Sequence, residues 1–199
     1  GVNVSFILKK LGMNNTALGF KAGFTGQFIE DELHKEGIQT QFVNVDGITR
    51  INVFTQVVST SEEFKLVNQG PSVSQPQEET LLKIIENMNT EDFLFVSGSH
   101  PEGITYTTYE KIAKAAQLRR FKLILDTSAD FVPDLLKYRP YLIKPNDEEL
   151  AEWFGLINPS LEEIKDCGQK LLEKGAENVL VSLGEKGAIL FTPTETIHV

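Results

Sequence analysis

The side chains best placed to do chemistry follow a short apolar stretch, Tyr141–Ile143, in the sequence YLIKPNDEEL. Pro145 biases Lys144 toward an extended conformation, so we expect a strand to end at Lys144 and a helix to begin after Asn146. Asn146 and Glu149 are three residues apart and therefore lie on one face of that helix. An amide oxygen beside a carboxylate at the end of a strand suits Mg²⁺, which keeps most of its waters and needs few protein ligands.

The same pair of residues also fits a simpler role at the start of the helix. The side chain of Asn146 can accept a hydrogen bond from an amide of the first turn, and Glu149 stands three residues later, as in a capping box. Acidic residues in that turn also favour the positive end of the helix dipole. Taken alone, the pattern favours the cap over the metal site, and the surrounding sequence must decide between them.

Three further segments place polar residues or glycines where a predicted strand ends. They are Ser97–Gly103, Asp126–Ser128 and Ser182–Gly187. Each is also an ordinary turn, and Asp126 is best explained as a turn residue at a strand end. However, ligands bind at the carboxyl ends of parallel strands, so these segments together with Lys144–Asn146 predict a ligand-binding side of the sheet. Glycines next to serine hydroxyls let amides and oxygens approach an anionic ligand closely.

Other candidate groups carry weaker signals. The glycine-rich segment Gly19–Gly26 precedes a predicted helix, Gln27–Lys35, and such a turn suits a phosphate. It lacks the G-x-G-x-x-G pattern and the Walker lysine, so close packing of the helix on a sheet explains it at least as well. His100 has no identifiable carboxylate partner, which argues against a general base. The cysteine and histidine residues lack the spacing of zinc ligands.

Composition narrows the class of protein. The chain has 199 residues, of which 41% are hydrophobic, and this is enough for a full globular core. Its net charge of −9 argues against a nucleic-acid-binding surface. There is no apolar run of membrane-spanning length and no signal-peptide pattern, so we expect a cytoplasmic protein without a membrane partner. The single cysteine, Cys167, fits a thiol in the core of a protein from a reducing compartment.

Strands and helices alternate along most of the chain. Helices are predicted over residues 2–11, Gln27–Lys35, Gln77–Asn87, Tyr106–Arg119, Ala129–Leu136, Asp147–Phe154 and Leu161–Lys174. After the first short strand, which begins at Thr16, the predicted strands are Phe93–Val96, Lys122–Leu125, Tyr141–Ile143, Asn178–Ser182, Ala188–Phe191 and Thr196–Val199. Short apolar strands with helical connections predict an α/β fold: a three-layer α/β/α sandwich around a mostly parallel sheet that is buried on both faces.

Residues 39–69 interrupt this alternation. They contain three β-rich runs, Thr40–Val45, Arg50–Thr60 and Glu63–Val67. Turn signals separate the runs, so we expect a meander that forms a separate small sheet, with Arg50 leading its central strand. Such a sheet would cover a cleft as a lid or pair with a second subunit. The α/β core would then comprise residues 1–38 and 70–199.

Taken together, these segments resemble the ribokinase-like, or pfkB, carbohydrate kinases. The resemblance covers essentially the whole chain and rests on GVNVS at 1–5, GFTGQFI at 23–29, GITRINV at 47–53, NQGP at 68–71, SGSHPEG at 97–103, LDTS at 125–128, LIKPNDEEL at 142–150 and SLGEKG at 182–187. It points to the branch of 1-phosphofructokinase and tagatose-6-phosphate kinase, and GFTGQFI and TRINV are closer to the former. It implies a ribokinase-like fold with a small inserted β lid.

The resemblance also implies roles for individual residues. By position, Asn3 would bind sugar hydroxyls, while Arg50 and Ser99 would bind the phosphate of the sugar; a guanidinium suits bidentate contact with phosphate. Glu149 would hold Mg²⁺ through a bound water. The residues implied for the phosphates of ATP are Lys144, Asn146, Ser182, Gly184 and Gly187. This chain departs from the family's usual SGSLPPG, because its sequence at residues 97–103 is SGSHPEG, with His100 and Glu102 in place of leucine and proline.

For the reaction, the resemblance implies ATP-dependent phosphorylation of fructose 1-phosphate with Mg²⁺. Tagatose 6-phosphate as the substrate stays open, as does a non-catalytic sensor of sugar phosphates or nucleotides on the same fold. The family's first strand and its later Gly-Ala-Gly-Asp motif, which carries the catalytic aspartate, have no counterpart here. We therefore expect the chain to be the middle of a kinase, and residues 1–199 alone to transfer no phosphate.

Overall fold

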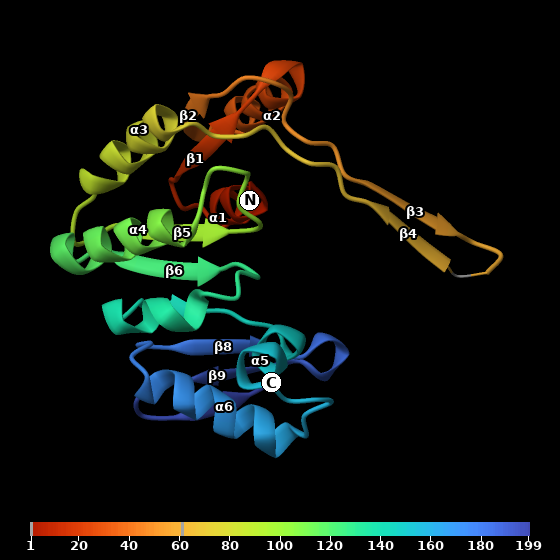
Figure 1. Ribbon diagram of the computed structural model, residues 1–199, viewed down its shortest axis with the longest axis vertical. Coiled ribbons are helices and arrows are strands. Elements are labelled where there is room, and N and C mark those ends of the chain that lie inside the picture. Colours follow the sequence, from red (N-terminus) through yellow and green to blue (C-terminus); the bar gives the residue numbers. More distant parts are fainter. Residues whose placement is uncertain (1, 61) are drawn as a thin grey trace. The chain divides into compact units, whose positions relative to one another are not determined.

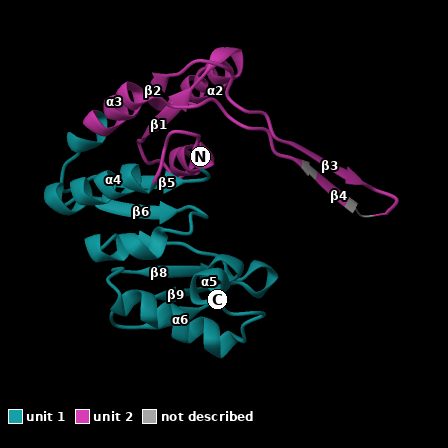
Figure 2. Cartoon of the chain, in the orientation of Figure 1, with its two compact units in different colours: residues 1, 84–99, 106–199 teal, residues 2–83, 100–105 magenta. Residues whose placement is uncertain are grey.

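The protein is described by a computed structural model that covers residues 2–60 and 62–199. The contacts divide the chain into two compact units, coloured teal and magenta in Figure 2. We call residues 84–99 and 106–199 the six-strand unit, and residues 2–83 and 100–105 the hairpin unit. Within the described ranges, no helix combines the length and apolar character needed to span a membrane.

The six-strand unit is built on one sheet with the strand order β10-β9-β8-β7-β6-β5 (Figure 1). The strands are β5 (Phe93–Ser97), β6 (Lys122–Asp126), β7 (Leu142–Ile143), β8 (Val179–Ser182), β9 (Ala188–Phe191) and β10 (Thr196–His198). Strands β5 to β8 pair in parallel, whereas β9 and β10 pair antiparallel with their neighbours. The expected α/β fold with a mostly parallel sheet is confirmed.

Helices cover this sheet. They are α4 (Tyr106–Arg119), the 3₁₀ helix η1 (Val132–Tyr138), α5 (Asp147–Phe154), α6 (Leu161–Glu173) and the short 3₁₀ helix η2 (Gly184–Lys186). Leu123, Ile124 and Leu125 follow one another in β6, and all three are buried. Because successive side chains of a strand point to opposite faces, both faces of the sheet are covered at this strand.

The structure differs from the helix that the sequence predicted over Ala129–Leu136. The structure has the 3₁₀ helix η1 at Val132–Tyr138 instead. Its buried residues Val132 and Leu135 are three apart, which matches the three-residue turn of a 3₁₀ helix. The Glu110 carboxylate of α4 accepts a hydrogen bond of 2.7 Å from the Tyr138 hydroxyl of η1. This bond, with contacts from two lysines and a second tyrosine, lowers the pKa of Glu110 to about 2.

The hairpin unit contains two helices and a two-stranded parallel sheet. They are α1 (Asn3–Lys10), β1 (Thr16–Lys21), α2 (Gly23–Lys35) and β2 (Gln39–Asn44). Helix α3 (Gln75–Glu86) begins in this unit and ends in the six-strand unit. A small core of Ala17, Leu33 and Ile38 holds the sheet to its helices. The sequence placed β2 in a three-stranded meander, and this was wrong, because β2 pairs with β1.

The other two predicted strands of the meander form an antiparallel hairpin, β3 (Val53–Val57) and β4 (Glu62–Leu66), which we call the hairpin arm. In Figure 1 this arm extends away from β1, β2 and α2 of the same unit. Val53 pairs with Leu66 and Thr55 with Phe64, so these four side chains share one face of the arm. Val53, Phe64 and Leu66 are 44%, 55% and 65% exposed, which leaves an apolar face uncovered.

Candidate functional site

The polar residues predicted at strand ends gather at one edge of the sheet in the six-strand unit. The Lys144 N–H donates to the Leu125 carbonyl over 2.9 Å, and the Ser182 N–H donates to the Pro145 carbonyl over 3.1 Å. Asn146, just beyond β7, and Ser182, the last residue of β8, form a parallel bridge. The ends of β6, β7 and β8 therefore lie side by side, and we call Asp126, Lys144, Asn146 and Ser182 the strand-end edge.

Lys144 and Asp126 form an ion pair across this edge. Lys144 Nζ lies 2.9 Å from Asp126 Oδ1, and the two side chains are 35% and 38% exposed. The pair holds the flexible lysine in one orientation at the surface while leaving it accessible to a ligand. From the sequence, Asp126 was expected to be only a turn residue. The signal for the pair was present, however, since Asp126 ends β6 and Lys144 directly follows β7, and these two strands pair in parallel.

Asn146 and Glu149 form the capping box that their spacing predicted at the start of α5. The Glu149 N–H donates to Asn146 Oδ1 over 2.7 Å, and the Asn146 N–H donates to Glu149 Oε2 over 3.0 Å. These bonds satisfy backbone donors of the first helical turn. Capping is thus an observed role of both side chains, and the magnesium role of Glu149 stays a prediction.

The donor set at this edge fits a Mg²⁺ ion that has few protein ligands. Among the described residues there is no group of three or more histidine, cysteine or acidic side chains that could hold a metal ion by itself. Glu149 and Asn146 instead place one carboxylate and one amide side by side. Such a set fits Mg²⁺ that is bound mainly by waters and substrate phosphates, with one or two protein carboxylates.

The loop after β8 contains Gly184 and Gly187. It folds back on itself, since the Leu183 N–H donates to the Gly187 carbonyl over 2.8 Å, and the Gly187 N–H donates to the Gly184 carbonyl over 3.2 Å. A Cβ atom at Gly187 would collide with the carbonyl oxygen of Val199, so this position requires glycine. The structure therefore places Gly184 and Gly187 in one tight loop that begins at Ser182 of the strand-end edge.

The predicted residue Ser99 follows β5, the neighbour of β6. The Gly98 N–H donates to the Asp126 carbonyl over 3.0 Å, which brings the start of this loop to the strand-end edge. Ser99 itself is exposed. The next residues, His100 and Glu102, belong to the hairpin unit, where the Glu102 carbonyl accepts a bond of 2.8 Å from the Val73 N–H.

The remaining predicted residues, Asn3 and Arg50, lie in the hairpin unit. Asn3 is the exposed first residue of α1. Arg50 is exposed too, but it does not lead a strand as expected, because β3 begins only at Val53. The preceding Thr49 is hydrogen bonded to the start of α2, which draws this part of the chain away from the β3–β4 ladder.

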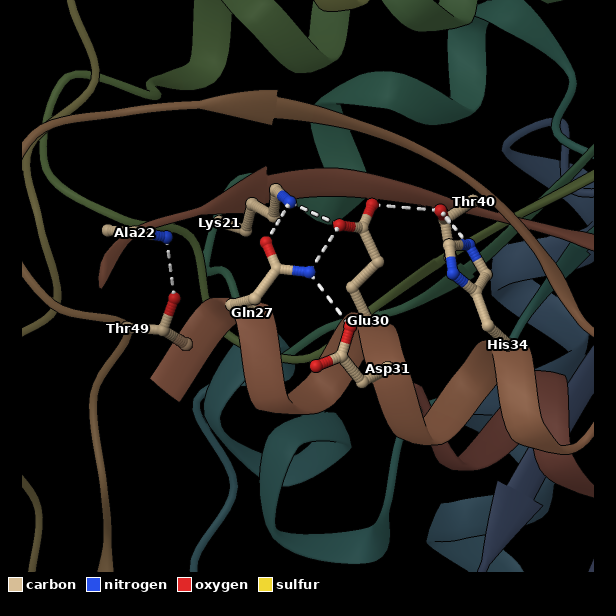
Figure 3. A network of polar contacts seen from close by, with 8 residues as sticks. All are labelled: Lys21, Ala22, Gln27, Glu30, Asp31, His34, Thr40 and Thr49. Atoms are coloured by element: carbon tan, nitrogen blue, oxygen red, sulfur yellow. Dashed lines mark hydrogen bonds and ion pairs between the residues drawn. The ribbon is translucent and has the colours of Figure 1, made fainter. Parts of the chain in front are cut away.

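A polar cluster that the sequence did not reveal ties α2 to β1 and β2 (Figure 3). Lys21 forms an ion pair with Glu30 and donates to Gln27 Oε1 over 3.0 Å. The Thr40 hydroxyl of β2 donates to Glu30 Oε1 over 2.9 Å. The hydrogen bond from Lys21 is the main cause of a lowered pKa for Glu30. The three-residue spacing of Gln27 and Glu30 indicated that these two side chains lie on one face of the helix. Nothing in the sequence indicated that Lys21 and Thr40 would contact Glu30 from the strands.

Polar groups at the carboxyl ends of parallel strands lie where open α/β sheets bind their ligands. A model of the pfkB family carbohydrate kinases matches residues 1–199, and the chain belongs to this family. The expected ribokinase-like fold and the resemblance to the 1-phosphofructokinase branch are thereby confirmed.

Relatives of known name support this assignment. The chain is 48% identical over 198 residues to D-tagatose-1-phosphate kinase of Bacillus licheniformis and 39% identical over 192 residues to 1-phosphofructokinase of Bacillus subtilis. These alignments cover 99% and 96% of this chain but 64% and 62% of the relatives. Phosphofructokinase-2 of Escherichia coli, in complex with substrates and products, superposes with a TM-score of 0.93 at 26% identity, covering all of this chain and 66% of that one.

Proposed function

We propose that the whole protein transfers the γ-phosphoryl group of ATP to the 6-hydroxyl of fructose 1-phosphate. The bond between the γ-phosphorus and its bridging oxygen breaks, a bond from the γ-phosphorus to the sugar oxygen forms, and the hydroxyl proton passes to a base. The products are ADP and fructose 1,6-bisphosphate. The family match over residues 1–199 carries the proposal. The reaction belongs in the cytoplasm, where ATP is the common phosphoryl donor.

The strand-end edge is the proposed site for the phosphates of ATP. Lys144, held by Asp126, supplies a positioned positive charge for them. Asn146 and the loop Ser182–Gly187 supply further polar groups. Gly184, which has open space where a Cβ atom would lie, allows close approach of the backbone, and Gly187 keeps the loop tight. Positioning and charge stabilisation of this kind provide most of the rate of phosphoryl transfer.

Mg²⁺ is part of this proposal, and Glu149 is the residue that would hold it, through a bound water, beside Asn146. When bound, the ion supplies positive charge that neutralises the phosphate oxygens. The capping box fixes the Glu149 side chain in position through the Asn146 N–H. The carboxylate therefore needs little reorganisation to take up this role.

The proposed contacts with the sugar phosphate come from three residues. Asn3 binds sugar hydroxyls, and Arg50 and Ser99 bind the phosphate group. Arg50 is exposed next to the hairpin arm, which makes its guanidinium accessible to a ligand. A planar guanidinium can donate two parallel hydrogen bonds to one phosphate.

A second substrate, tagatose 1-phosphate, is favoured by the relative at 48% identity, whose name is D-tagatose-1-phosphate kinase. Tagatose and fructose differ only in the configuration at C4, so both 1-phosphates present a free 6-hydroxyl. Tagatose 6-phosphate, the alternative expected from the sequence, has its 6-hydroxyl already esterified and would have to accept the phosphoryl group at its free 1-hydroxyl.

The first test is a coupled assay of the whole protein with ATP, Mg²⁺ and each ketohexose phosphate. We expect turnover with fructose 1-phosphate at about 1–100 s⁻¹, the usual range for kinases. A higher kcat/KM for tagatose 1-phosphate would select the second substrate. Tight binding of sugar phosphate without turnover would identify a sensor and overturn the proposed reaction.

The second test concerns Arg50. Arg50→Ala should raise the KM for the sugar phosphate by about 30- to 150-fold, which corresponds to the loss of a charge-assisted hydrogen bond worth about 2–3 kcal/mol. The KM for ATP should change much less. An unchanged KM for the sugar phosphate would show that Arg50 does not bind it.

The third test separates capping from metal binding by Glu149. The chain has a matched control in α6, where Ser160 and Glu163 form a second capping box. Glu149→Gln and Glu163→Gln should each lower the melting temperature slightly, since both remove a negative charge from a first helical turn. Only Glu149→Gln should raise the Mg²⁺ concentration for half-maximal activity, by about 10- to 100-fold. If both variants need the same Mg²⁺ concentration for half-maximal activity, Glu149 caps the helix and does not bind the metal.

We further propose that the apolar face of the hairpin arm, formed by Val53, Phe64 and Leu66, pairs with the arm of a second copy of the protein. A two-stranded hairpin has no core of its own and is only marginally stable when isolated. Its uncovered apolar face gains stability when another surface buries it. Phosphofructokinase-2 of Escherichia coli has a tetrameric form, and self-association of this relative supports the proposal.

The fourth test uses the two faces of the arm. Phe64 lies on the apolar face and Phe54 on the opposite one, and they are 55% and 66% exposed. Phe64→Asp should shift the whole protein toward monomer in sedimentation experiments, because burying a charge in an interface is costly. Phe54→Asp is the control and should shift it less. Equal masses for the wild type and both variants would exclude the arm as an interface.

A further inference from the structure

The glycine-rich segment Gly19–Gly26, which leads into α2 and forms its first turn, is a sequence motif that the proposed function does not use. Helix α2 begins at Gly23, not at Gln27 as expected, and its first turn packs against residues 47–49. A Cβ atom at Gly23 would lie 2.8 Å from the Gly47 carbonyl oxygen, and one at Gly26 would lie 2.9 Å from Thr49 Oγ1. The space beside both glycines is thus filled by the chain itself. The motif serves close packing and not a phosphate cradle.

Thr49 is held to the start of α2 by three hydrogen bonds. Its N–H donates to the Ala22 carbonyl over 3.0 Å, and its Oγ1 accepts from the Ala22 N–H over 2.9 Å. Its carbonyl accepts from the Thr25 hydroxyl over 2.7 Å. Thr25 is only 9% exposed, so its hydroxyl is shielded from competing water. Figure 3 shows the bond between Ala22 and Thr49 at the N-terminal end of α2.

The chain is fixed again directly after Arg50. The Asn68 side chain donates to the Ile51 carbonyl over 2.6 Å, which joins the two ends of the hairpin arm at its base. Gly70 lies beside the Arg50 side chain, since a Cβ atom there would be 3.9 Å from Arg50 Cδ. The backbone of Arg50 is therefore held on both sides, by Thr49 before it and Ile51 after it.

We infer that Thr25 and Thr49 are positioning residues for Arg50, and that the glycine-rich motif exists to let them reach each other. The inference rests on the proposed role of Arg50 in binding the sugar phosphate. An arginine whose backbone is already fixed loses less conformational freedom when it binds a ligand, so its anchor contributes to affinity without touching the substrate.

The test replaces the Thr25 hydroxyl in the whole protein. Thr25→Val keeps the shape of the side chain but removes the donor to Thr49, and it should raise the KM for fructose 1-phosphate by about 3- to 10-fold. The KM for ATP should stay unchanged. Thr25→Ser retains the hydroxyl and should restore the wild-type KM for the sugar. Thr40→Val is the matched control, because it removes a hydroxyl that binds Glu30 toward the other end of α2.

A double variant shows whether the effect passes through Arg50. In an Arg50→Ala background, Thr25→Val should raise the sugar KM no further. A Thr25→Val substitution that raises the sugar KM by the same factor with Arg50 present and with Arg50→Ala would overturn the inference. So would an unchanged sugar KM in Thr25→Val alongside a raised KM in Arg50→Ala, a result that leaves the proposed role of Arg50 intact. If Arg50→Ala has no effect on the sugar KM, that proposed role fails instead.

Thr49→Val provides an independent variant in case Thr25→Val folds poorly. It removes only the acceptor of the Ala22 N–H and leaves the Thr49 carbonyl in place. It should raise the sugar KM in the same direction, again without a change in the KM for ATP. A loss of thermal stability with both KM values unchanged would show that the anchor serves folding alone and would overturn the inference.

Discussion

The proposed ATP site depends on the parallel pairing of β6, β7 and β8. This register puts Asp126 beside Lys144, and two residues further on it puts Asn146 beside Ser182. The bonds from Lys144 to Leu125 and from Ser182 to Pro145 continue the pairing beyond the last residue of β7. A slip of one residue would turn every side chain of a strand to the opposite face of the sheet. The pairing register of these strands therefore determines which side chains are present at the strand-end edge.

Features with local causes could be predicted from the sequence. The spacing of Asn146 and Glu149 predicted a helix start, and the capping box is present with both of its bonds. Short apolar strands predicted a sheet buried on both faces, as the three successive buried residues Leu123–Leu125 of β6 confirm. The polar strand ends were expected at one edge of the sheet, where the structure places them, because parallel strands present their carboxyl ends together; ligand binding at that edge stays a prediction.

Features with distant causes could not be predicted in the same way. The start of α2 was placed too late because glycine is a poor helix former, and nothing nearby revealed that residues 47–49 would pack against Gly23 and Gly26. Arg50 was placed in a strand because the residues after it favour one, whereas Thr49 is bound to Ala22 and Thr25 at the start of α2, 27 and 24 residues earlier. In both places a long-range contact outweighed local propensity.

The base of the hairpin arm also determines how the arm can move. Thr49 is fastened to α2, and Ile51 is fastened to Asn68, so the first free joint of the arm lies beyond these bonds. Any change in the direction of the arm must therefore occur beyond Ile51 and Asn68, and it leaves in place the hydrogen bonds that hold the backbone on either side of Arg50.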